Sequence, residues 1–418
     1  MARAFQSIEN HELGEGGGRG IDGAVGISQN KSRIEINERY IEAGREMGIP
    51  IVADPNAQRE GVGYATWTIR GGRRSSTGQT FLKIARKRPN LRVETGVLVD
   101  RVLFDGRRAA GVSARKHGQP IEYHTDGEVL LCAGGLVSPL ILQRSGIGDP
   151  ALLGRLGIEV VQPRPAVGNR MLEHRLLMME FALNRPVSDN PQFRGIRLGL
   201  NALRYALTRS GPIARGSYEV AGFVRTRPEL DRPDAEILMA PFSWGMYRGK
   251  VAVGRNHAIH MFGYPLRSRS EGSIAIRSTD PAAPPLIRPN YLADPYDRQV
   301  TVDMFRLIRR WMTQPAIAPL IAGETKPGLQ VESDDDIIAE FKRHGSAGFH
   351  ACGTARMGSD ADAVLDPQLR VNGVANLRVI DGSIMPTMVS ANTNGPIMAI
   401  GWRASEIIRE RRRNALAA

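Results

Sequence analysis

Two residues near the carboxyl end of the chain have the chemistry needed to handle an alcohol. His350 lies in GFHACGTARMG at 348–358, and Asn392 lies in LRVIDGSIMPTMVSANTNGP at 377–396. An imidazole titrates near neutral pH and can accept a hydroxyl proton, whereas an amide can hydrogen-bond the same oxygen without titrating. Both segments are apolar and glycine-rich, so they can bring the two polar side chains together. The pair therefore indicates oxidation of an alcohol.

Taken alone, neither residue excludes a structural role. His350 is one of eight histidines, and a buried, hydrogen-bonded histidine is the common case. Asn392, beside Asn394 and Gly395, also has the composition of a turn. The choice between these interpretations depends on the rest of the chain.

The other histidines give weaker signals. His257 and His260 in HAIH have the alternation of a strand. A metal site would need a third His, Cys or carboxylate at ligand spacing, and none recurs. We therefore predict no metal site, and a structural role for His174 at the end of VGNRMLEH.

The first sixty residues predict a loop and then a helix. Residues 32–49, SRIEINERYIEAGREMGI, have the spacing of one amphipathic helix. Ahead of it, Gly18, Gly20 and Gly23 fall in a GxGxxG register. A dinucleotide loop of that kind needs an apolar strand before it and a helix opening on its last glycine. The preceding HELGEGG is polar and the following AVGISQNKS does not start a helix, so we predict a surface loop.

The stretch 88–148 predicts strands followed by a helix. LRVETGVLVDRVLF is rich in β-branched residues, and the Asp-Gly pair at 105–106 predicts a hairpin turn. After a second hairpin, residues 128–135 predict a buried strand that ends in glycines. The next helix is expected to begin with Ser138 as its N-cap and Pro139 as its first residue. A strand that delivers glycines to a helix N-terminus is typical of a cofactor contact.

The two cysteines indicate neither a disulfide nor a reactive thiol. Cys132 and Cys352 lie in apolar segments rich in Gly and Ala, without the spacing of a disulfide framework. No basic cluster surrounds either one to stabilise a thiolate. We predict that both are small, buried packing residues.

From about 171 to 365 the pattern changes to longer mixed segments, and we expect a substrate domain there. Residues 271–300 predict an antiparallel strand, turns and the start of a helix. The helix in DRQVTVDMFRLIRRWMTQ has an apolar face that is typical of a core. That face comprises Val300, Val302, Met304, Phe305, Ile308 and Trp311.

Composition and charge narrow the class of protein. The 418 residues are 42% hydrophobic, enough to bury a large core in two domains. No run approaches the roughly 18 apolar residues that cross a bilayer, and the N-terminus has no apolar secretion segment, so we predict a cytoplasmic location.

The net charge of +13 would suit a protein that binds nucleic acid, but the arginines are thinly spread apart from the cluster at 409–413. We predict no nucleic-acid partner, and the charge leaves open peripheral contact with an acidic inner-membrane surface.

Further segments of several residues each resemble one known family. The matching segments are GGRRSSTGQTFL at 71–82, the strand region at 88–112, CAGGLVSPLILQRSGIG at 132–148, VGNRMLEH at 167–174 and the block at 348–396. Together they are similar to the glucose-methanol-choline (GMC) family of FAD-dependent oxidoreductases over nearly the whole chain. The departures are Gly135, where Ser, Thr, Ala or Pro is usual, the shifted Asn169, and Glu173 in place of Asp.

The resemblance implies an α/β fold, α+β overall, in which a Rossmann-like FAD-binding domain adjoins an antiparallel-sheet substrate domain. We expect residues 1–60 to form a partial substrate or lid segment and residues 61–170 to form part of the FAD-binding domain. Residues 171–365 would form the substrate-binding domain. Residues 366–418 would return to the FAD-binding domain with the active-site loop and a C-terminal helix.

The family's first strand, its GxGxxG phosphate loop and its GGSSxxN-type segment have no counterpart in this sequence. We therefore expect an N-terminally truncated member that lacks its first βαβ unit. It would also lack the helix N-terminus that neutralises the FAD pyrophosphate. Such a chain is expected to bind FAD weakly or not at all.

The resemblance also assigns roles to residues. His350 would be the general base and Asn392 the residue that orients the substrate oxygen, as in choline-oxidising members. The positions that would contact FAD are Val99, Ala133, Gly134, Asp381, Gly382, Asn394 and Pro396. A quaternary ammonium substrate would need an aromatic or carboxylate lining, for which Phe242, Trp244 and Tyr247 are candidates.

The predicted function is FAD-dependent oxidation of a primary alcohol, choline-like or other, to an aldehyde by hydride transfer to the flavin N5. The electron acceptor would be oxygen or a quinone. Two alternatives stay open: a hydroxynitrile lyase, which has this fold and keeps FAD without using its redox chemistry, and an inactive truncated remnant. The sequence does not determine which alcohol is used, which acceptor is used, or the oligomeric state.

Overall fold

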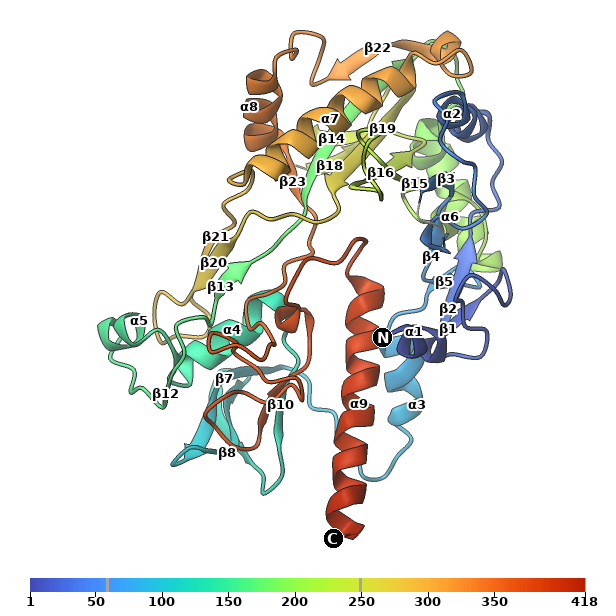
Figure 1. Ribbon diagram of the computed structural model, residues 1–418. Helices are drawn as coiled ribbons and strands as arrows, with labels where there is room; N and C mark the ends of the chain where they lie inside the picture. The colour runs from blue at the N-terminus through green and yellow to red at the C-terminus, as the bar shows by residue number, and fades with distance from the viewer. Residues whose placement is uncertain (58–59, 248–249, 418) are drawn as a thin grey trace.

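The computed structural model describes residues 1–57, 60–247 and 250–417. Its largest sheet has seven strands, with β22-β14-β19-β16-β15-β3 side by side and β23 paired to β14, all antiparallel. The bounds are β3 Gly61–Tyr64, β14 Arg175–Leu183, β15 Val220–Val224, β16 Ala235–Ala240, β19 Ala258–Pro265, β22 Ile321–Lys326 and β23 Ser346–Ala347. Strands that are distant in the sequence therefore meet in one sheet (Figure 1).

The two faces of this sheet differ in what covers them. In β14, Leu177, Met179, Phe181 and Leu183 are buried, whereas the residues between them are half-buried, because successive side chains point to opposite faces. The buried face packs on α2 (Glu35–Glu46), α7 (Pro295–Met312) and α8 (Asp334–His344). The opposite face carries the apolar and aromatic side chains that adjoin the candidate site.

Helices α2 and α7 lie where the sequence predicts them. The α7 helix begins after the N-cap Asp294, whose side chain accepts a backbone N–H of the first turn. All six residues predicted for its core face are buried. Trp311 stacks on Tyr40 of α2 with ring centroids 4.8 Å apart and donates its indole N–H to the Tyr40 carbonyl. The predicted helices and the predicted core face are confirmed.

A second group of elements surrounds α4. Strands β7, β8 and β9 form two successive antiparallel hairpins, as predicted, and β10 pairs in parallel with β24. The bounds are β7 Val97–Asp105, β8 Arg108–Lys116, β9 Gln119–His124, β10 Val129–Leu131, β24 Leu377–Val379 and α4 Gly134–Arg144. Val102, Leu131, Ile141 and Val379 belong to the core of this group. The carboxyl ends of the two parallel strands open side by side, an arrangement at which α/β proteins bind ligands.

The predicted bounds of β10 and α4 are wrong. The sequence predicts a buried strand over 128–135, but β10 has three residues and Leu130 is 44% exposed. The α4 helix begins at Gly134 rather than after Ser138. The Ser138 hydroxyl accepts from the Ala133 N–H at 3.1 Å and donates to the Asp381 carboxylate at 2.6 Å. It thus makes a long-range contact instead of capping the helix.

Pro139 is tolerated inside α4 because another group replaces its missing donor. A proline has no N–H for the carbonyl four residues earlier, which here belongs to Gly135. The Thr354 hydroxyl donates to that carbonyl at 2.6 Å. The segment that carries the candidate site is thereby joined to the first turn of α4.

The prediction that both cysteines are buried is wrong for one of them. Cys352 is buried and its Sγ lies 3.9 Å from the Met388 sulfur, but Cys132 is exposed. Leu131 points into the core, so the alternation of the strand turns Cys132 outward.

The sequence predicts that the glycine-rich stretch near the N-terminus does not start a helix, and the structure confirms this. It leads into β2 (Val25–Gln29). The Gly20 N–H donates to the Glu9 carboxylate, and a Cβ on Gly23 would lie 2.1 Å from the Ile8 carbonyl carbon. These glycines allow close packing of the backbone.

The α9 helix (Asn394–Ala417) runs from the candidate site to the carboxyl end of the chain, and α1 (Ala2–Ile8) packs against it (Figure 1). In the part of the chain that the structure describes, no helix combines the length and hydropathy needed to span a membrane. The antiparallel strand and the helix start predicted at 271–300 are present as β20, which pairs with β21, and as the first turn of α7. The remaining helices and strands are α3 Lys83–Ala85, α5 Pro150–Arg155, α6 Gly195–Thr208, β1 Glu9–His11, β4 Thr66–Trp67, β5 Ile69–Arg70, β6 Arg73–Arg74, β11 Ile147–Gly148, β12 Gln162–Pro163, β13 Asn169–Met171, β17 Trp244–Tyr247, β18 Lys250–Val253, β20 Gly272–Ala275 and β21 Leu286–Arg288.

Candidate active site

Backbone pairing between two distant segments forms the site. Leu172 and Cys352 exchange N–H···O bonds of 3.0 and 2.9 Å, and the Gly348 N–H donates to the His174 carbonyl at 2.8 Å. The pairing continues where β23 joins β14. It brings His174 next to His350, 176 residues later in the chain.

A buried carboxylate fixes both histidine backbones. One oxygen of Glu173 accepts the N–H of His350 at 2.8 Å and the N–H of His174 at 3.0 Å. Burial raises the pKa of the Glu173 carboxyl to about 7, against the effect of these backbone donors. The carboxylate therefore holds the two segments together.

The hydrogen bonds of the two imidazoles determine which nitrogen of His350 is free. His174 Nδ1 lies 2.8 Å from His350 Nδ1, and His174 Nε2 lies 3.2 Å from the Leu266 carbonyl oxygen. A carbonyl can only accept, so His174 carries its proton on Nε2 and, when neutral, accepts at Nδ1. His350 must then donate from Nδ1, which leaves a lone pair on its Nε2.

Burial keeps both rings neutral. It lowers the pKa of His174, which is further lowered by the neighbouring His350, and it lowers the pKa of His350 to about 4. A neutral imidazole with a free Nε2 can act as a general base over the physiological range.

We expect the base to stay active in mild acid. An imidazole with an ordinary pKa of about 6.5 would be mostly protonated at pH 5.5, whereas His350 would still be neutral. The titratable neighbours are His174, which stays neutral, and Glu173, whose pKa of about 7 falls inside this range but whose carboxyl contacts backbone N–H groups rather than the ring. Stopped-flow flavin reduction by an alcohol should therefore have nearly equal rate constants at pH 5.5 and pH 8. A severalfold drop with a midpoint near 6.5 would show that burial does not lower the pKa of His350.

Asn392 completes the arrangement. Its amide nitrogen lies 3.4 Å from His350 Nε2, and the amide is exposed while His350 is half-buried. A hydroxyl placed beside both nitrogens can donate to Nε2 and accept from the amide. The structure therefore brings together the two residues that the sequence singles out.

Tyr264 supports the histidine pair from the sheet. Its ring stacks on His174 with centroids 4.3 Å apart and lies 5.7 Å from the His350 ring. Its hydroxyl donates to Glu236, which is fully buried and whose pKa burial raises to about 7. A stacked aromatic ring with a satisfied hydroxyl restricts how His174 can turn.

Sequence reasoning missed four of these residues. The sequence assigns His174 a structural role, but its side chain contacts the candidate base. The segment VGNRMLEH, which matches the family pattern, is the signal that could have identified Glu173 and His174. Tyr264 and Glu236 lie in ordinary alternating strands, so no local signal distinguishes them.

Asp381 is satisfied entirely by this chain. One oxygen accepts from the Gly134 N–H at 2.9 Å and the Ser138 hydroxyl at 2.6 Å, and the other accepts from the N–H and hydroxyl of Ser383 at 2.8 and 2.6 Å. A carboxylate has about four lone-pair sites, and all of them are used. Asp381 therefore positions the N-terminus of α4 against the turn at 382–384.

Gly135, a departure from the family pattern, allows a close backbone approach. A Cβ at this position would lie 2.0 Å from the Ala351 carbonyl oxygen. Only a hydrogen fits there unless the segment of His350 shifts. The glycine thus brings α4 against the residue that follows the candidate base.

Comparison with known proteins agrees with this geometry. Two family models, both described as GMC oxidoreductase, match residues 1–176 and 268–401. This chain belongs to the GMC oxidoreductase family. The resemblance inferred from the sequence motifs and the expected fold class are confirmed.

Relatives of this GMC oxidoreductase include choline dehydrogenases. Human mitochondrial choline dehydrogenase is 36% identical over 97% of this chain and 68% of its own length. The oxygen-dependent choline dehydrogenase of Ectopseudomonas mendocina is 36% identical over 97% of this chain and 73% of its own length. Among solved structures, pyridoxine 4-oxidase from Mesorbium loti is similar with a TM-score of 0.84 and 26% identity, over 97% of this chain and 76% of that chain. Formate oxidase from Aspergillus oryzae RIB40 shares the fold, with a TM-score of 0.89 at 23% identity over 99% of this chain and 78% of that chain.

The residues predicted to contact a cofactor occupy three places in this GMC oxidoreductase. Ala133 and Gly134 lie beside Asp381 and Gly382 where β10 and β24 end. Asn394 and Pro396 lie in the first turn of α9, two and four residues after Asn392. Val99 lies apart from both, in β7, where it packs against the core around α4.

His257 and His260, considered above for a metal site, make contacts within the protein. His260 Nε2 lies 2.8 Å from a Glu180 oxygen, and His257 Nδ1 lies 2.7 Å from the Ser188 hydroxyl. Among the residues that the structure describes, no group of three or more His, Cys, Asp or Glu side chains could hold a metal ion.

Proposed function

We propose that this GMC oxidoreductase catalyses the FAD-dependent oxidation of a primary alcohol to an aldehyde. One observation carries the proposal: His350 Nε2, which has a free lone pair, lies 3.4 Å from the Asn392 amide nitrogen. A base and a non-titrating donor at this spacing suit a hydroxyl that must lose its proton while its oxygen is held. Family membership supports the same chemistry.

The residues around α4 and α9 fit a bound FAD. Parallel strands β10 and β24 end next to each other, and the N-terminus of α4 follows the first of them. The carboxyl ends of parallel strands in α/β proteins are places at which cofactors bind. The proposed contacts are Val99, Ala133, Gly134, Gly382, Asn394 and Pro396, with Asp381 holding the backbone of Gly134 and Ser383. When bound, FAD supplies the acceptor for the hydride that leaves the carbinol carbon.

His350 and Asn392 have different roles at the substrate oxygen. The hydroxyl proton moves to His350 Nε2, and Asn392 keeps the oxygen in place, so that the carbinol hydrogen has a fixed direction. The imidazolium that results still donates from Nδ1 to His174, because His174 presents only a lone pair there. The same hydrogen bond therefore serves the ring before and after it takes the proton.

We further propose the domain division into residues 1–60, 61–170, 171–365 and 366–418. Separate hydrophobic cores support it, one under the large sheet and one around α4. Residues 366–418 include β24, which pairs with β10 of the second segment.

The proposed substrate is an uncharged alcohol with an apolar or aromatic substituent. The sheet face that adjoins His350 carries Leu176, Met178, Tyr218 and Phe262, together with Ala391 beside Asn392. Two of the residues considered for an aromatic lining join this patch: Trp244 lies 5.3 Å from Phe242 and 5.2 Å from Phe262, between ring centroids. The side chain of the third, Tyr247, lies outside the described residues.

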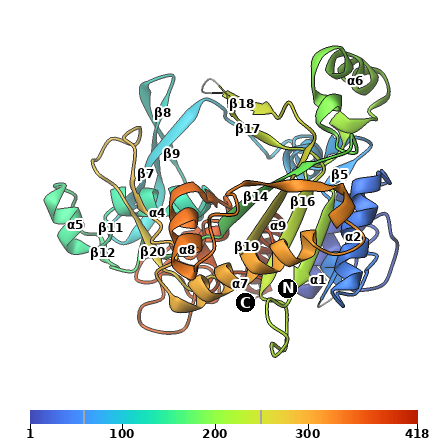
Figure 2. The same ribbon diagram turned by 90° about the horizontal axis from the view of Figure 1, so that it is seen from above.

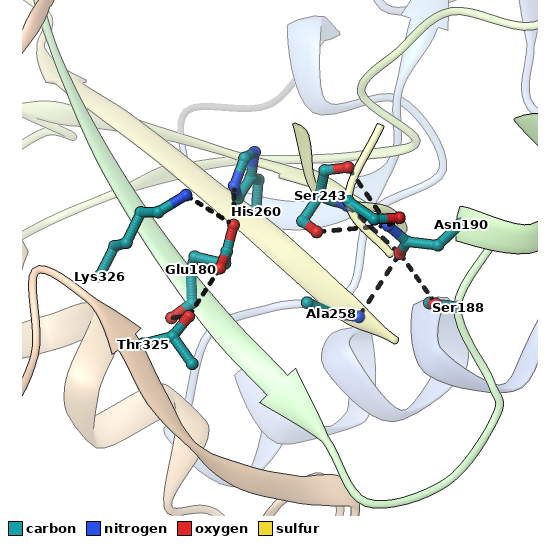
Figure 3. A network of polar contacts seen from close by, with 9 residues as sticks. Glu180, Ser188, Asn190, Ser243, Ala258, His260, Thr325 and Lys326 are labelled. Atoms are coloured by element: carbon teal, nitrogen blue, oxygen red, sulfur yellow. Dashed lines mark hydrogen bonds and ion pairs between the residues drawn. The ribbon is translucent and has the colours of Figure 1, made fainter. Parts of the chain in front are cut away.

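The carboxylates of this face already make hydrogen bonds to other side chains of the protein. Glu180 contacts His260 at 2.8 Å, Thr325 at 2.7 Å and Lys326 at 3.0 Å (Figure 3). It also lies six residues along the strand from His174, a span of about 20 Å. Glu236 is buried under Tyr264. A quaternary ammonium two carbons from the reacting hydroxyl would find no free carboxylate among the described strands of this face, so only aromatic rings such as those of Trp244 and Phe262 could contact its charge.

Anaerobic reduction of the flavin tests the proposal. The protein is incubated with excess FAD, then mixed with benzyl alcohol or with choline, and the visible absorbance of the flavin is followed. We expect benzyl alcohol to bleach it at least about tenfold faster per unit concentration than choline, because each buried apolar side chain contributes on the order of 1.5–3 kcal/mol. The flavin content of the purified protein, before FAD is added, tests the expectation of weak FAD binding.

The outcomes separate the proposals. If choline bleaches the flavin as fast as benzyl alcohol, the substrate class is wrong but the alcohol oxidation stands. If no alcohol bleaches a bound flavin, the oxidation itself is wrong. Cleavage of mandelonitrile without bleaching would favour the hydroxynitrile lyase alternative.

The proposed electron acceptor is oxygen or a quinone. The name of the bacterial relatives, oxygen-dependent choline dehydrogenase, supports oxygen. Reoxidation of the reduced flavin in air, compared with reoxidation by a soluble quinone without air, distinguishes the two.

A further inference from the structure

The α6 helix exposes an apolar stripe. Its sequence, GIRLGLNALRYALT, places Ile196, Leu200, Leu203 and Leu207 within about 60° of arc on one side of the helix. These side chains are 84, 61, 57 and 75% exposed. A stripe of this kind normally faces a protein core, and an exposed one marks an interaction surface.

The opposite side of α6 is anchored to the protein. Asn201 donates to the Gln192 carbonyl at 2.9 Å, and the Tyr205 hydroxyl donates to the Gly72 carbonyl at 3.0 Å. The segment before the helix is fixed by Asn190, whose amide contacts Ser188, Ser243 and Ala258 (Figure 3). Figure 2 shows α6 standing clear of the neighbouring elements. The stripe therefore points directly away from the molecule on a fixed support.

Arginines surround the stripe. Arg194, Arg197, Arg204 and Arg209 lie on or beside α6, and the hairpin that Tyr205 contacts adds further exposed arginines. The hairpin residues are Arg70, Arg73 and Arg74. The sequence has no Asp or Glu at 61–93 or at 190–218. Within the described residues, none of these seven arginines forms an ion pair with a carboxylate, so the surface around the stripe has a strong positive charge.

We propose that α6 is a membrane-docking helix that inserts its apolar stripe into the interface of an anionic phospholipid bilayer. An apolar stripe flanked by arginines is the arrangement with which amphipathic helices lie in a membrane surface. Anionic headgroups complement the arginines, which a second copy of the same positive surface would not do. The proposal gives a location to the membrane contact that the net charge of the chain leaves open.

Cosedimentation with vesicles tests the proposal. The purified chain is mixed with vesicles of phosphatidylcholine alone or of phosphatidylcholine with phosphatidylglycerol, at low and high salt. We expect binding to the anionic vesicles that weakens as salt rises, because exposed charges are screened. Leu200→Glu should weaken this binding by at least about tenfold, because it places a charge in the apolar stripe. The matched control is Leu329→Glu, which makes the same change at a site that is 69% exposed and outside α6; it should bind as the unaltered chain does.

Two further variants and one measurement complete the test. Arg197→Gln and Arg204→Gln should each reduce binding to anionic vesicles and leave thermal unfolding unchanged, since both side chains are exposed. Binding that Leu200→Glu and Leu329→Glu reduce equally would overturn the assignment to α6, as would failure to bind anionic vesicles. Sedimentation equilibrium tests whether the stripe binds a second copy of the chain instead. A dimer that Leu200→Glu dissociates would show that it does, and the membrane proposal would be wrong.

Discussion

Replacing His350 with alanine should lower the rate of flavin reduction by about 10²–10⁴-fold, the usual contribution of a general base. His350 Nε2 carries the lone pair that faces Asn392, and no other described side chain presents a free base next to that amide. The measurement is the single-turnover rate of flavin bleaching by an alcohol in anaerobic stopped flow. The affinity for the alcohol should change much less, because the apolar sheet face remains in place.

A second histidine, six residues earlier in the chain, provides the control. His344 is exposed on α8 and contacts only Glu340 among the described residues, at 2.7 Å. His344→Ala should therefore reduce the flavin at the unaltered rate. Equal loss in the two variants, or a normal rate in His350→Ala, would show that His350 is not the base.

His174→Leu should lower the same rate by about 10–100-fold, although His174 is not expected to touch the substrate. Loss of a partner that orients a reacting residue commonly has an effect of this size. The leucine removes the acceptor of the His350 Nδ1–H, so the ring can turn or move its proton to Nε2. The protonated ring would also lose a hydrogen bond inside the protein.

His174→Asn is the matched variant for this prediction. Asparagine and leucine have nearly the same shape, so both leave the same space under Tyr264. Only asparagine can place an oxygen near the position of the former Nδ1 and accept from His350. We expect the asparagine variant to keep most of the rate. Equal rates in the two variants would mean that His174 acts only by filling space.

Local pattern predicts the regular elements of this protein well. The core face of α7 follows from its helical spacing, and the hairpins of β7, β8 and β9 follow from alternation and turn residues. These features depend on neighbours a few positions away, where helical and strand periodicity already places each side chain. The predicted bounds of α4 are wrong for the opposite reason. Ser138 binds Asp381, and Thr354 binds the Gly135 carbonyl that Pro139 leaves without a donor, and both partners lie more than 200 residues away.

The amino-acid sequence alone identifies the reactive pair. His350 and Asn392 have side chains whose chemistry suits an alcohol wherever they lie, and the surrounding motifs assign the chain to its family. The fold was needed to find the partner of the base. The ring of His174 reaches His350 only because residues 172–174 pair with residues 348–352, and the Leu266 carbonyl then determines where its proton lies.

The same division holds for α6. Its sequence has the spacing of an amphipathic helix, and that spacing normally predicts burial. Only the tertiary structure decides which side of the helix meets the protein, because the Tyr205 hydroxyl binds the carbonyl of Gly72, in a distant segment of the chain. Side-chain chemistry and short-range periodicity are local properties. Proton positions and exposed faces depend on contacts that exist only after the chain has folded.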